Sequence, residues 1–374
     1  MQSEPQAGSR VATASKTIPM GSRLKLLLPS SLVLCALLAA CNSQPRKPEA
    51  PASSAPANPL AFGDARDAGA PDNPVLRGQV ALDRRGFSPG VIDGKDNAAT
   101  ALALRGFQQA QGLPTTGKFD PATQQALFAG IDSTGTRLVV IPVAFARGPF
   151  HPDLPRDIAG QARFDHLGYR SMSEALAERF HTTPEMLLAL NGPGTVLGAG
   201  RKVRVPDIPD AAPAQIRDDK TGWADTLVRL GVSGDQPHAD HIVVDRSDGA
   251  LRAFDTQDRL IAQFPVTTGS AHDPLPIGTW KIVGEARNPD YHFNPDLFWD
   301  AKKSAKDKLL QPGPNGPVGV VWLDLSKAHY GIHGTPEPQN IGKTESHGCV
   351  RLTNWDAARL AQMVSPGTKV VFQI

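Results

Sequence analysis

The sequence carries two short segments, YGIHGT (Tyr330–Thr335) and SHGCVRL (Ser346–Leu352), that lie one loop apart near its carboxyl end. They place His333 sixteen residues before Cys349 and His347 two residues before it. A free thiol is mostly protonated at neutral pH, so a nucleophilic cysteine needs an imidazole to take its proton or pair with the thiolate. The glycine that separates His347 from Cys349 allows a turn that exposes backbone N–H groups where an oxyanion would form. The segments therefore predict a cysteine nucleophile with a histidine base.

Two other hypotheses concern the same cysteine. Free cysteine is among the most buried residue types, so Cys349 is an inert core residue in the first hypothesis, which explains neither histidine. In the second, Cys349, His347 and His333 form a zinc site with an open fourth position, since residues two apart on a strand share a face. Zinc ligands usually occur in tight paired spacings, so we expect no metal and no other cofactor.

The amino-terminal segment is typical of an export signal. Arg23 and Lys25 precede an uncharged run, Leu26–Ala40, which is followed by Cys41. A membrane-spanning helix needs roughly 20 apolar residues, so this run is too short for one and predicts a signal peptide over residues 1–41. The residues LAAC, which end at Cys41, resemble the lipobox of bacterial lipoproteins, whose cysteine is acylated.

This resemblance implies where the protein is found. Asn42 follows the cysteine, whereas an aspartate at that position favours inner-membrane retention in similar Gram-negative lipoproteins. We therefore expect a periplasmic protein that is anchored by lipid on Cys41, in the outer membrane of a Gram-negative bacterium. Cys35 is lost with the signal peptide, which leaves Cys349 as the only thiol and excludes an intramolecular disulfide. An unpaired thiol in an oxidising compartment is either buried or kept for chemistry.

Composition gives no indication of nucleic-acid binding, and it distinguishes a tether from the first folded region. The net charge of +2, from 39 basic and 37 acidic residues, is too small to indicate nucleic-acid binding by itself. Residues 42–70 are rich in Pro, Ala and Ser and predict a solvated tether. Residues 71–130 predict three helices, of which the second spans Ala98–Ala110 and the third Pro121–Ala129. The order of turns and helices resembles the small three-helix peptidoglycan-binding domain, with a departure at Lys95-Asp96-Asn97.

The next part of the chain contains a second helical pair. Residues 131–167 predict a strand and a linker, with LVVIPVAF (Leu138–Phe145) as the strand-like segment. Within residues 168–210 we expect helices at Ser173–Phe180 and after Thr183-Pro184, and a strand at Lys202–Val205. This order resembles a LysM carbohydrate-binding module, although its opening strand is not evident. Residues 211–237 are predicted to be a linker.

The last segment, residues 238–374, changes to β alternation. Two β segments, His241–Asp255 and Leu260–Ser270, are predicted to meet through a turn at residues 247–249, and further strands follow. A helix is expected at Trp355–Val364, with Asn354 as its N-cap. The predicted fold class is multidomain α+β: a mainly β catalytic domain, preceded by a small three-helix domain and a LysM-like βααβ segment.

The residues around the cysteine carry a family resemblance. IHGT and SHGCVRL, at this spacing, resemble the signature of the L,D-transpeptidase (YkuD-type) catalytic domain. The likeness extends to LPIGTW (Leu275–Trp280), QPGPNGPVG (Gln311–Gly319) and TNWD (Thr353–Asp356). It implies that Cys349 is the nucleophile and that His333 is the general base, oriented by a backbone carbonyl of the Gly334–Thr335 segment.

The resemblance also implies supporting residues. His347 and Gly348 would shape an oxyanion hole with the N–H of Cys349, and Ser346 would support the loop. Arg351 would donate hydrogen bonds either to a peptide carboxylate or to the loop itself.

Similar enzymes cleave the bond between the third residue of a tetrapeptide stem and its terminal D-alanine. The partners expected here are peptidoglycan stem peptides and glycan. The acceptor stays open among a neighbouring stem amine, which yields a 3→3 cross-link, water, which makes an L,D-carboxypeptidase, and a lysine of an outer-membrane lipoprotein. A non-catalytic cell-wall-binding lipoprotein is the alternative of a different class.

Overall fold

A computed structural model describes residues 58–66, 69, 72–212 and 219–374 of the chain. The predicted signal peptide, Cys41 and most of the predicted tether lie outside these residues. The chain divides into a unit of residues 1–53 and a unit of residues 54–374, and every described residue belongs to the second unit. Among the described residues, none of the helices has the length and apolarity needed to cross a membrane.

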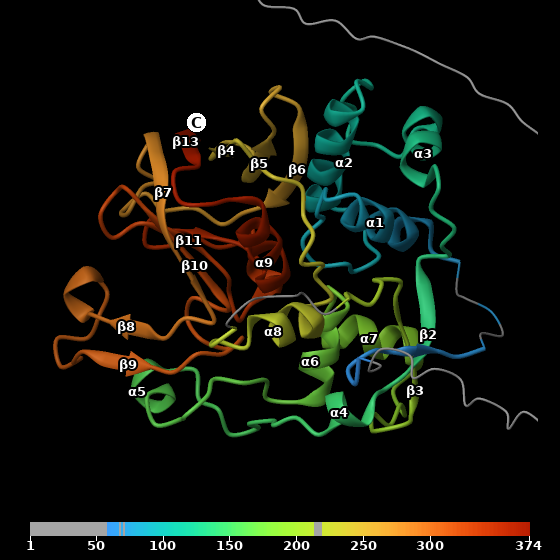
Figure 1. Ribbon diagram of the computed structural model, residues 1–374, viewed down its shortest axis with the longest axis horizontal. Helices are drawn as coiled ribbons and strands as arrows, with labels where there is room; N and C mark the ends of the chain where they lie inside the picture. Colours follow the sequence, from blue (N-terminus) through green and yellow to red (C-terminus); the bar gives the residue numbers. More distant parts are fainter. Residues whose placement is uncertain (1–57, 67–68, 70–71, 213–218) are drawn as a thin grey trace, which may run out of the picture. The chain divides into compact units, whose positions relative to one another are not determined.

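Three capped helices form the first structured region (Figure 1). They are α1 (Pro74–Arg84), α2 (Ala98–Ala110) and α3 (Pro121–Phe128). Each begins after an Asn or Asp whose side chain accepts a backbone N–H of the first turn, which satisfies a donor that has no partner within the helix. The helices share a core that includes Leu82, Phe107 and Leu127. The predicted helices are confirmed to within a residue at α2 and α3.

A βααβ arrangement follows. Strand β2 (Thr136–Val140) pairs antiparallel with β3 (Lys202–Pro206), and β1 (Gly63–Asp64) pairs with the other edge of β2. Helices α6 (Met172–Arg179) and α7 (Pro184–Asn191) lie between β2 and β3 in sequence. Two four-residue helices, α4 (Val143–Ala146) and α5 (Ile158–Gln161), occupy the connection from β2 to α6. The strand predicted within residues 131–167 is therefore present as β2, and its pairing with β3 is what the sequence did not reveal.

The strand predicted at Leu138–Phe145 is shifted in the structure. It begins two residues earlier, at Thr136, and ends at Val140. Pro142 is the N-cap of helix α4, and a proline has no N–H with which to continue a β-ladder.

The remaining residues build one mixed eight-stranded sheet with the order β12-β11-β10-β7-β13-β4-β5-β6. Two neighbouring pairs, β11 with β12 and β13 with β4, are parallel, and the other pairs are antiparallel. The strands are β4 (His241–Asp245), β5 (Ala250–Phe254), β6 (Leu260–Pro265), β7 (Gly278–Arg287), β10 (Val321–Leu325), β11 (Gly331–His333), β12 (Val350–Arg351) and β13 (Lys369–Gln373). The two predicted β segments form three strands because the turn between β4 and β5 divides the first of them.

Shorter elements surround this sheet. Helix α8 (Trp223–Leu230) precedes it in the chain, in the region predicted to be a linker. A separate two-stranded ribbon, β8 (Tyr291–Phe293) with β9 (Lys308–Leu310), lies between β7 and β10 in sequence. Two 3-10 helices, η1 (Pro295–Leu297) and η2 (Pro338–Asn340), shape the loops after β8 and β11.

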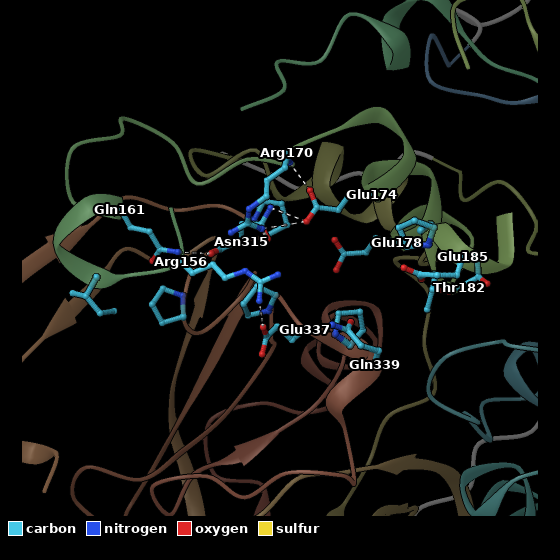
Figure 2. A pocket seen from close by; sticks show the side chains of 18 residues that line it. Arg156, Gln161, Arg170, Glu174, Glu178, Thr182, Glu185, Asn315, Glu337 and Gln339 are labelled. Carbon is cyan, nitrogen blue, oxygen red and sulfur yellow. Dashed lines mark hydrogen bonds and ion pairs between the residues drawn. The ribbon is translucent and has the colours of Figure 1, made fainter. Parts of the chain in front are cut away.

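A cavity of about 550 Å³ lies where the helical regions meet the sheet domain (Figure 2). Its walls come from helix α6, from the turn between α6 and α7, and from two loops of the sheet domain. The residues are drawn from Arg170–Glu185 on one side and from Pro314–Pro317 and Pro336–Gln339 on the other, with α5 at one end.

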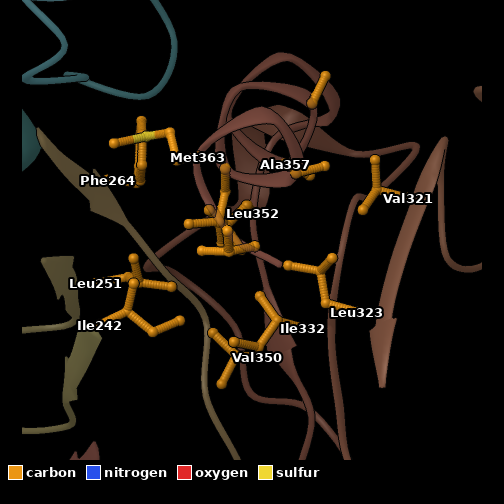
Figure 3. Close-up of a cluster of buried hydrophobic side chains, with 14 of the residues drawn as sticks. Ile242, Leu251, Phe264, Val321, Leu323, Ile332, Val350, Leu352, Ala357 and Met363 are labelled. Carbon is orange, nitrogen blue, oxygen red and sulfur yellow. The ribbon is translucent and has the colours of Figure 1, made fainter. Parts of the chain in front are cut away.

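The main core lies between the sheet and helix α9 (Asn354–Met363) (Figure 3). Ile242, Leu251 and Ile332 face the helix from three different strands, and all are buried. Trp355 is also fully buried, and its ring stacks on His181 with centroids 5.0 Å apart. The helix is therefore enclosed on its outer side by the preceding helical regions.

The predicted N-cap of α9 is wrong by one residue. Thr353 is the N-cap, since its hydroxyl accepts the backbone N–H of Asp356 at 3.2 Å. Asn354 is instead the first helical residue and is fully buried. Its side-chain amide forms hydrogen bonds with three residues outside the helix, Glu178, Pro314 and Val320.

A buried ion pair joins the three-helix region to α9. Asp83 of α1 accepts from the two terminal guanidinium nitrogens of Arg359, at 2.7 and 3.0 Å, and from Nδ1 of His181 at 3.1 Å. Burial by itself would raise the pKa of Asp83, but the charges of Arg359 and His181 hold it well below its usual range. Removing one member of such a group leaves an uncompensated charge away from water.

We therefore expect Asp83→Asn to lower the free energy of unfolding by about 3–5 kcal/mol, because Arg359 loses the carboxylate to which both of its terminal nitrogens donate. Denaturant unfolding of the full chain at neutral pH measures the change. Asp225→Asn is the control, since Asp225 forms an exposed pair with Arg229 one turn along α8, and should cost less than about 1 kcal/mol. Equal losses in the two variants would contradict a structural role for the buried pair.

Candidate active site

The parallel pairing of β11 with β12 brings the predicted nucleophile and base together. Ile332 lies opposite Val350 and His333 opposite Arg351. Cys349 directly precedes β12, and its thiol interacts with the backbone of Gly331. Side chains two apart on a strand share one face of a sheet. Cys349, Arg351 and His333 therefore project from the same face, at the end of adjacent strands.

The orientation of His333 agrees with the expectation. Its Nδ1 lies 2.7 Å from the carbonyl oxygen of Gly334, and its ring stacks on Trp322 with centroids 5.4 Å apart. A carbonyl only accepts, so Nδ1 carries the proton and Nε2 keeps a free lone pair. Burial and the charge of Arg351 lower the pKa of His333 to about 3, against the opposing hydrogen bond to Gly334. The imidazole is therefore neutral and able to accept a proton.

Cys349 is protonated at rest. Burial raises the pKa of its thiol, although the Gly331 backbone and Arg351 act in the opposite direction. The thiol hydrogen bond to the carbonyl of His329 is long, at 3.9 Å. A neutral thiol beside a neutral imidazole favours proton transfer during attack over a preformed thiolate–imidazolium pair. The burial of the two groups, which raises the pKa of the Cys349 thiol and lowers that of His333, thus favours one of the two possibilities that the sequence left open.

The loop before Cys349 is held by its own hydrogen bonds. The hydroxyl of Ser346 donates to the carbonyl of Cys349 at 2.6 Å, and its backbone N–H donates to Thr268 at 3.0 Å. Gly348 has a φ of +102°, and a Cβ there would lie 2.6 Å from the Tyr330 ring. Glycine is required at this position by both the backbone conformation and the close ring.

His347 points toward the loop between β8 and β9. Its Nε2 lies 3.0 Å from a carboxylate oxygen of Asp300, and the rings of Phe298 and Trp299 lie nearby, with centroids 5.2 and 6.3 Å away. The imidazole thus binds this loop. Only the backbone of His347 is therefore left to form the turn before Cys349. The sequence offered no signal for Asp300, because it lies 47 residues away in a region without a motif.

Arg351 has a different environment from its neighbours. It is partly buried, and within the described part of the chain its side chain makes no hydrogen bond or ion pair. Its charge acts on Cys349, Glu337 and Tyr291 at longer range. Tyr291 of β8 was missed by sequence reasoning, and its pKa rises to about 12 because it is buried and faces Cys349.

The zinc hypothesis has no supporting geometry. No group of three or more His, Cys, Asp or Glu side chains within residues 58–66, 69, 72–212 and 219–374 is arranged to hold a metal ion. The two histidines nearest in sequence to Cys349 have other partners, Gly334 and Asp300.

Comparisons with known proteins agree with this arrangement. The family model of the L,D-transpeptidase catalytic domain (YkuD) matches residues 239–372, and that of a peptidoglycan-binding domain matches residues 71–127. A candidate L,D-transpeptidase of Bacillus licheniformis, YkuD, is 31% identical over 201 residues, which cover 53% of this chain and 90% of that protein. One of Fuscovulum blasticum is 30% identical over 183 residues, covering 47% and 92%.

Among solved structures, an L,D-transpeptidase of Xylanimonas cellulosilytica overlaps 87% of this chain and 100% of its own, with 16% identity and a TM-score of 0.32. The sequence relatives are matched over nearly their whole length, and the catalytic-domain match contains both His333 and Cys349. The chain belongs to the L,D-transpeptidase (YkuD) family, and the protein is an L,D-transpeptidase.

Proposed function

We propose that Cys349 attacks the third residue of a peptidoglycan tetrapeptide stem, usually a diamino acid, at the carbonyl that is bonded to the terminal D-alanine. His333 acts as the base. The observation that carries this proposal is the neutral imidazole of His333, held at Nδ1 by Gly334 and placed on the same sheet face as Cys349. A backbone carbonyl does for this histidine what a carboxylate does in other triads.

The two half-reactions balance around these residues. Nε2 of His333 takes the thiol proton as the sulfur–carbon bond forms, and the developing oxyanion faces N–H groups of the Gly348–Cys349 turn. The proton then passes to the departing amine of D-alanine as the carbon–nitrogen bond breaks, which leaves a thioester. An acceptor amine attacks the thioester and gives its proton to His333, which returns it to the sulfur.

For the acceptor, we propose the amine of a neighbouring stem, which produces a 3→3 cross-link. A lysine of an outer-membrane lipoprotein would react by the same chemistry, and water would make the enzyme an L,D-carboxypeptidase. The peptidoglycan-binding domain at residues 71–127 supports a wall substrate.

Arg351 is proposed to bind the carboxylate of the D-alanine that leaves. Its guanidinium has no hydrogen-bond partner in the described part of the chain, and it lies on the same face as Cys349. These features support the carboxylate role over the alternative that it braces the loop. Guanidinium groups bind carboxylates through paired, directional hydrogen bonds.

A second wall-binding unit is proposed in the βααβ region, as a LysM-like module. Its two strands, β2 and β3, pair with each other. In the sequence, helices α6 and α7 lie between them, which is the order expected for such a module. The similarity to the Bacillus licheniformis relative extends over 201 residues, which is more than residues 239–372 contain. Shared sequence therefore reaches into the region that precedes the catalytic domain.

We propose that the mature protein is anchored by lipid on Cys41 at the periplasmic side of the outer membrane. In a Gram-negative host, Cys41→Ala should abolish incorporation of labelled palmitate into the full chain and shift it from the membrane to the soluble fraction. Cys35→Ala is the matched control, because Cys35 lies in the segment that is removed, and it should be labelled like the wild type. Label retained by Cys41→Ala would rule out this anchor.

Muropeptide analysis of isolated cell wall after incubation with the protein tests the reaction itself. We expect free D-alanine and 3→3 cross-linked dimers, both absent with Cys349→Ala. Trimmed tripeptides without dimers would assign water as the acceptor and overturn the cross-linking proposal. Co-sedimentation of the Cys349→Ala chain with the same wall tests whether the two accessory regions bind it.

His333→Ala should slow acylation of Cys349 by about 10²–10⁴-fold, the usual contribution of a positioned acid–base group. The base works when unprotonated, and its pKa of about 3 keeps it so, so the wild-type rate should stay level between about pH 5 and 7. Mass spectrometry of carbapenem adducts against time measures both. Arg351→Gln is the comparison, and should raise KM for the tetrapeptide more than it lowers kcat. A wild-type acylation rate that falls as the pH is lowered through the ordinary pKa range of histidine would contradict a His333 that stays neutral.

A further inference from the structure

A buried carboxyl group outside the catalytic domain faces that domain. Glu178 lies on the last turn of α6, is 7% exposed and has no place in the reaction described above. Figure 2 shows its carboxyl group at the cavity between α6 and the loops of the sheet domain. Burial raises its pKa to about 8, although hydrogen bonds from Tyr169 and Asn354 oppose that effect. A buried carboxyl group lowers the stability of the fold unless hydrogen bonds compensate for its removal from water, so the partners of Glu178 matter.

The contact that Glu178 makes is with Asn354, the first residue of α9. The amide nitrogen of Asn354 donates to a carboxyl oxygen of Glu178 at 2.7 Å and to the carbonyl of Pro314 at 3.1 Å. Its amide oxygen accepts from the backbone N–H of Val320 at 3.2 Å. Rotating the amide by half a turn would place its nitrogen against the N–H of Val320, two donors, and its oxygen against the carbonyl oxygen of Pro314, two acceptors. Glu178 therefore helps to determine which way the amide of Asn354 points.

The amide oxygen of Asn354 rests on the backbone that orients His333. A Cβ on Gly334 would lie 2.2 Å from that oxygen, and one on Gly319 would lie 1.9 Å from it. Both glycines are therefore pressed against Asn354 without room for a side chain. Gly334 is the residue whose carbonyl accepts a hydrogen bond from Nδ1 of His333, so the amide of Asn354 packs directly against the backbone that carries this acceptor.

We propose that Glu178 is a positioning residue for the catalytic histidine, acting through the amide of Asn354 and the backbone of Gly334. The helical region that precedes the catalytic domain thereby contributes to the alignment of His333 with Cys349. This inference deepens the proposed function, because it rests on His333 as the base. Misplacing a catalytic group by about 1 Å can lower the rate by as much as about 10²-fold. A loss that is confined to the transition state lowers kcat and leaves KM unchanged.

The effect should therefore appear in kcat and not in KM. In the full chain, Glu178→Leu removes the nearer of the two acceptors of the Asn354 amide nitrogen and should lower kcat about tenfold, with KM changed by less than about twofold. Glu178→Gln keeps an acceptor oxygen at the same place and should restore kcat to within about twofold of the wild type. Glu174→Leu is the matched control, since it lies one turn earlier on α6 and lacks contact with Asn354; kcat should be unchanged.

A double-mutant cycle tests the route. If Glu178 acts through Asn354, Glu178→Leu should add nothing to the loss that Asn354→Ala causes, whereas independent effects would add. Multiplied losses in the double variant would overturn the proposed route, and wild-type kcat in Glu178→Leu would overturn the proposal itself. A drop in Glu178→Gln as large as in Glu178→Leu would also count against it.

A readout that does not need turnover keeps this test separate from the proposed function. The hydrogen-bonded Nδ1–H of His333, identified by its loss in His333→Ala, should be seen by NMR in the wild type and in Glu178→Gln. It should shift or broaden in Glu178→Leu and stay in place in Glu174→Leu. If the wild type failed to release D-alanine, the proposed function would fail, and this resonance would still decide the positioning role. An unchanged resonance in Glu178→Leu would refute that role.

Discussion

The structure depends on the burial of helix α9. Nine of its ten residues are buried, so Asn354, Asp356 and Arg359 cannot be satisfied by water and bond to other parts of the protein. Asp83 of α1 pairs with Arg359, the hydroxyl of Ser88 donates to Asp356 at 2.7 Å, and Glu178 of α6 accepts from Asn354. The helical regions are therefore part of the same packed structure as the sheet domain.

This constraint reaches the active site because α9 begins directly behind it. Asn354 lies against Gly334, and Gly334 orients His333. Cys349 is placed separately, by the pairing of β11 with β12 and by the hydroxyl of Ser346. His333 and Cys349 are thus held by two different sets of contacts. Burial keeps both groups neutral at rest, so the imidazole is ready to accept a proton when the thiol attacks.

Sequence reasoning located the groups whose signals are local. The helices at Ala98–Ala110 and Pro121–Phe128 follow from apolar periodicity and capping residues, which act within a few positions. His333 and Cys349 were identified because the chemistry of a thiol requires a base and because the surrounding residues form a recognisable pattern. A strand was predicted at Leu138–Phe145, close to β2, but its pairing with β3 was missed, since β3 begins more than sixty residues later and no short-range pattern links the two. Asn354 was assigned as a cap because a position beside a helix start is typical of asparagine.

The sequence by itself indicated Cys349 and His333 as candidate nucleophile and base, and determined the family and the helices Ala98–Ala110 and Pro121–Phe128, because each depends on neighbouring residues or on a contiguous motif. Only the tertiary structure decided that Thr353 caps α9, that the imidazole of His347 is bound by Asp300, and that Glu178 contacts Asn354 from 176 residues away. The physical reason is the same in each case. A buried polar side chain takes whichever partner the packing brings within about 3 Å, and that partner carries no mark in the sequence around it.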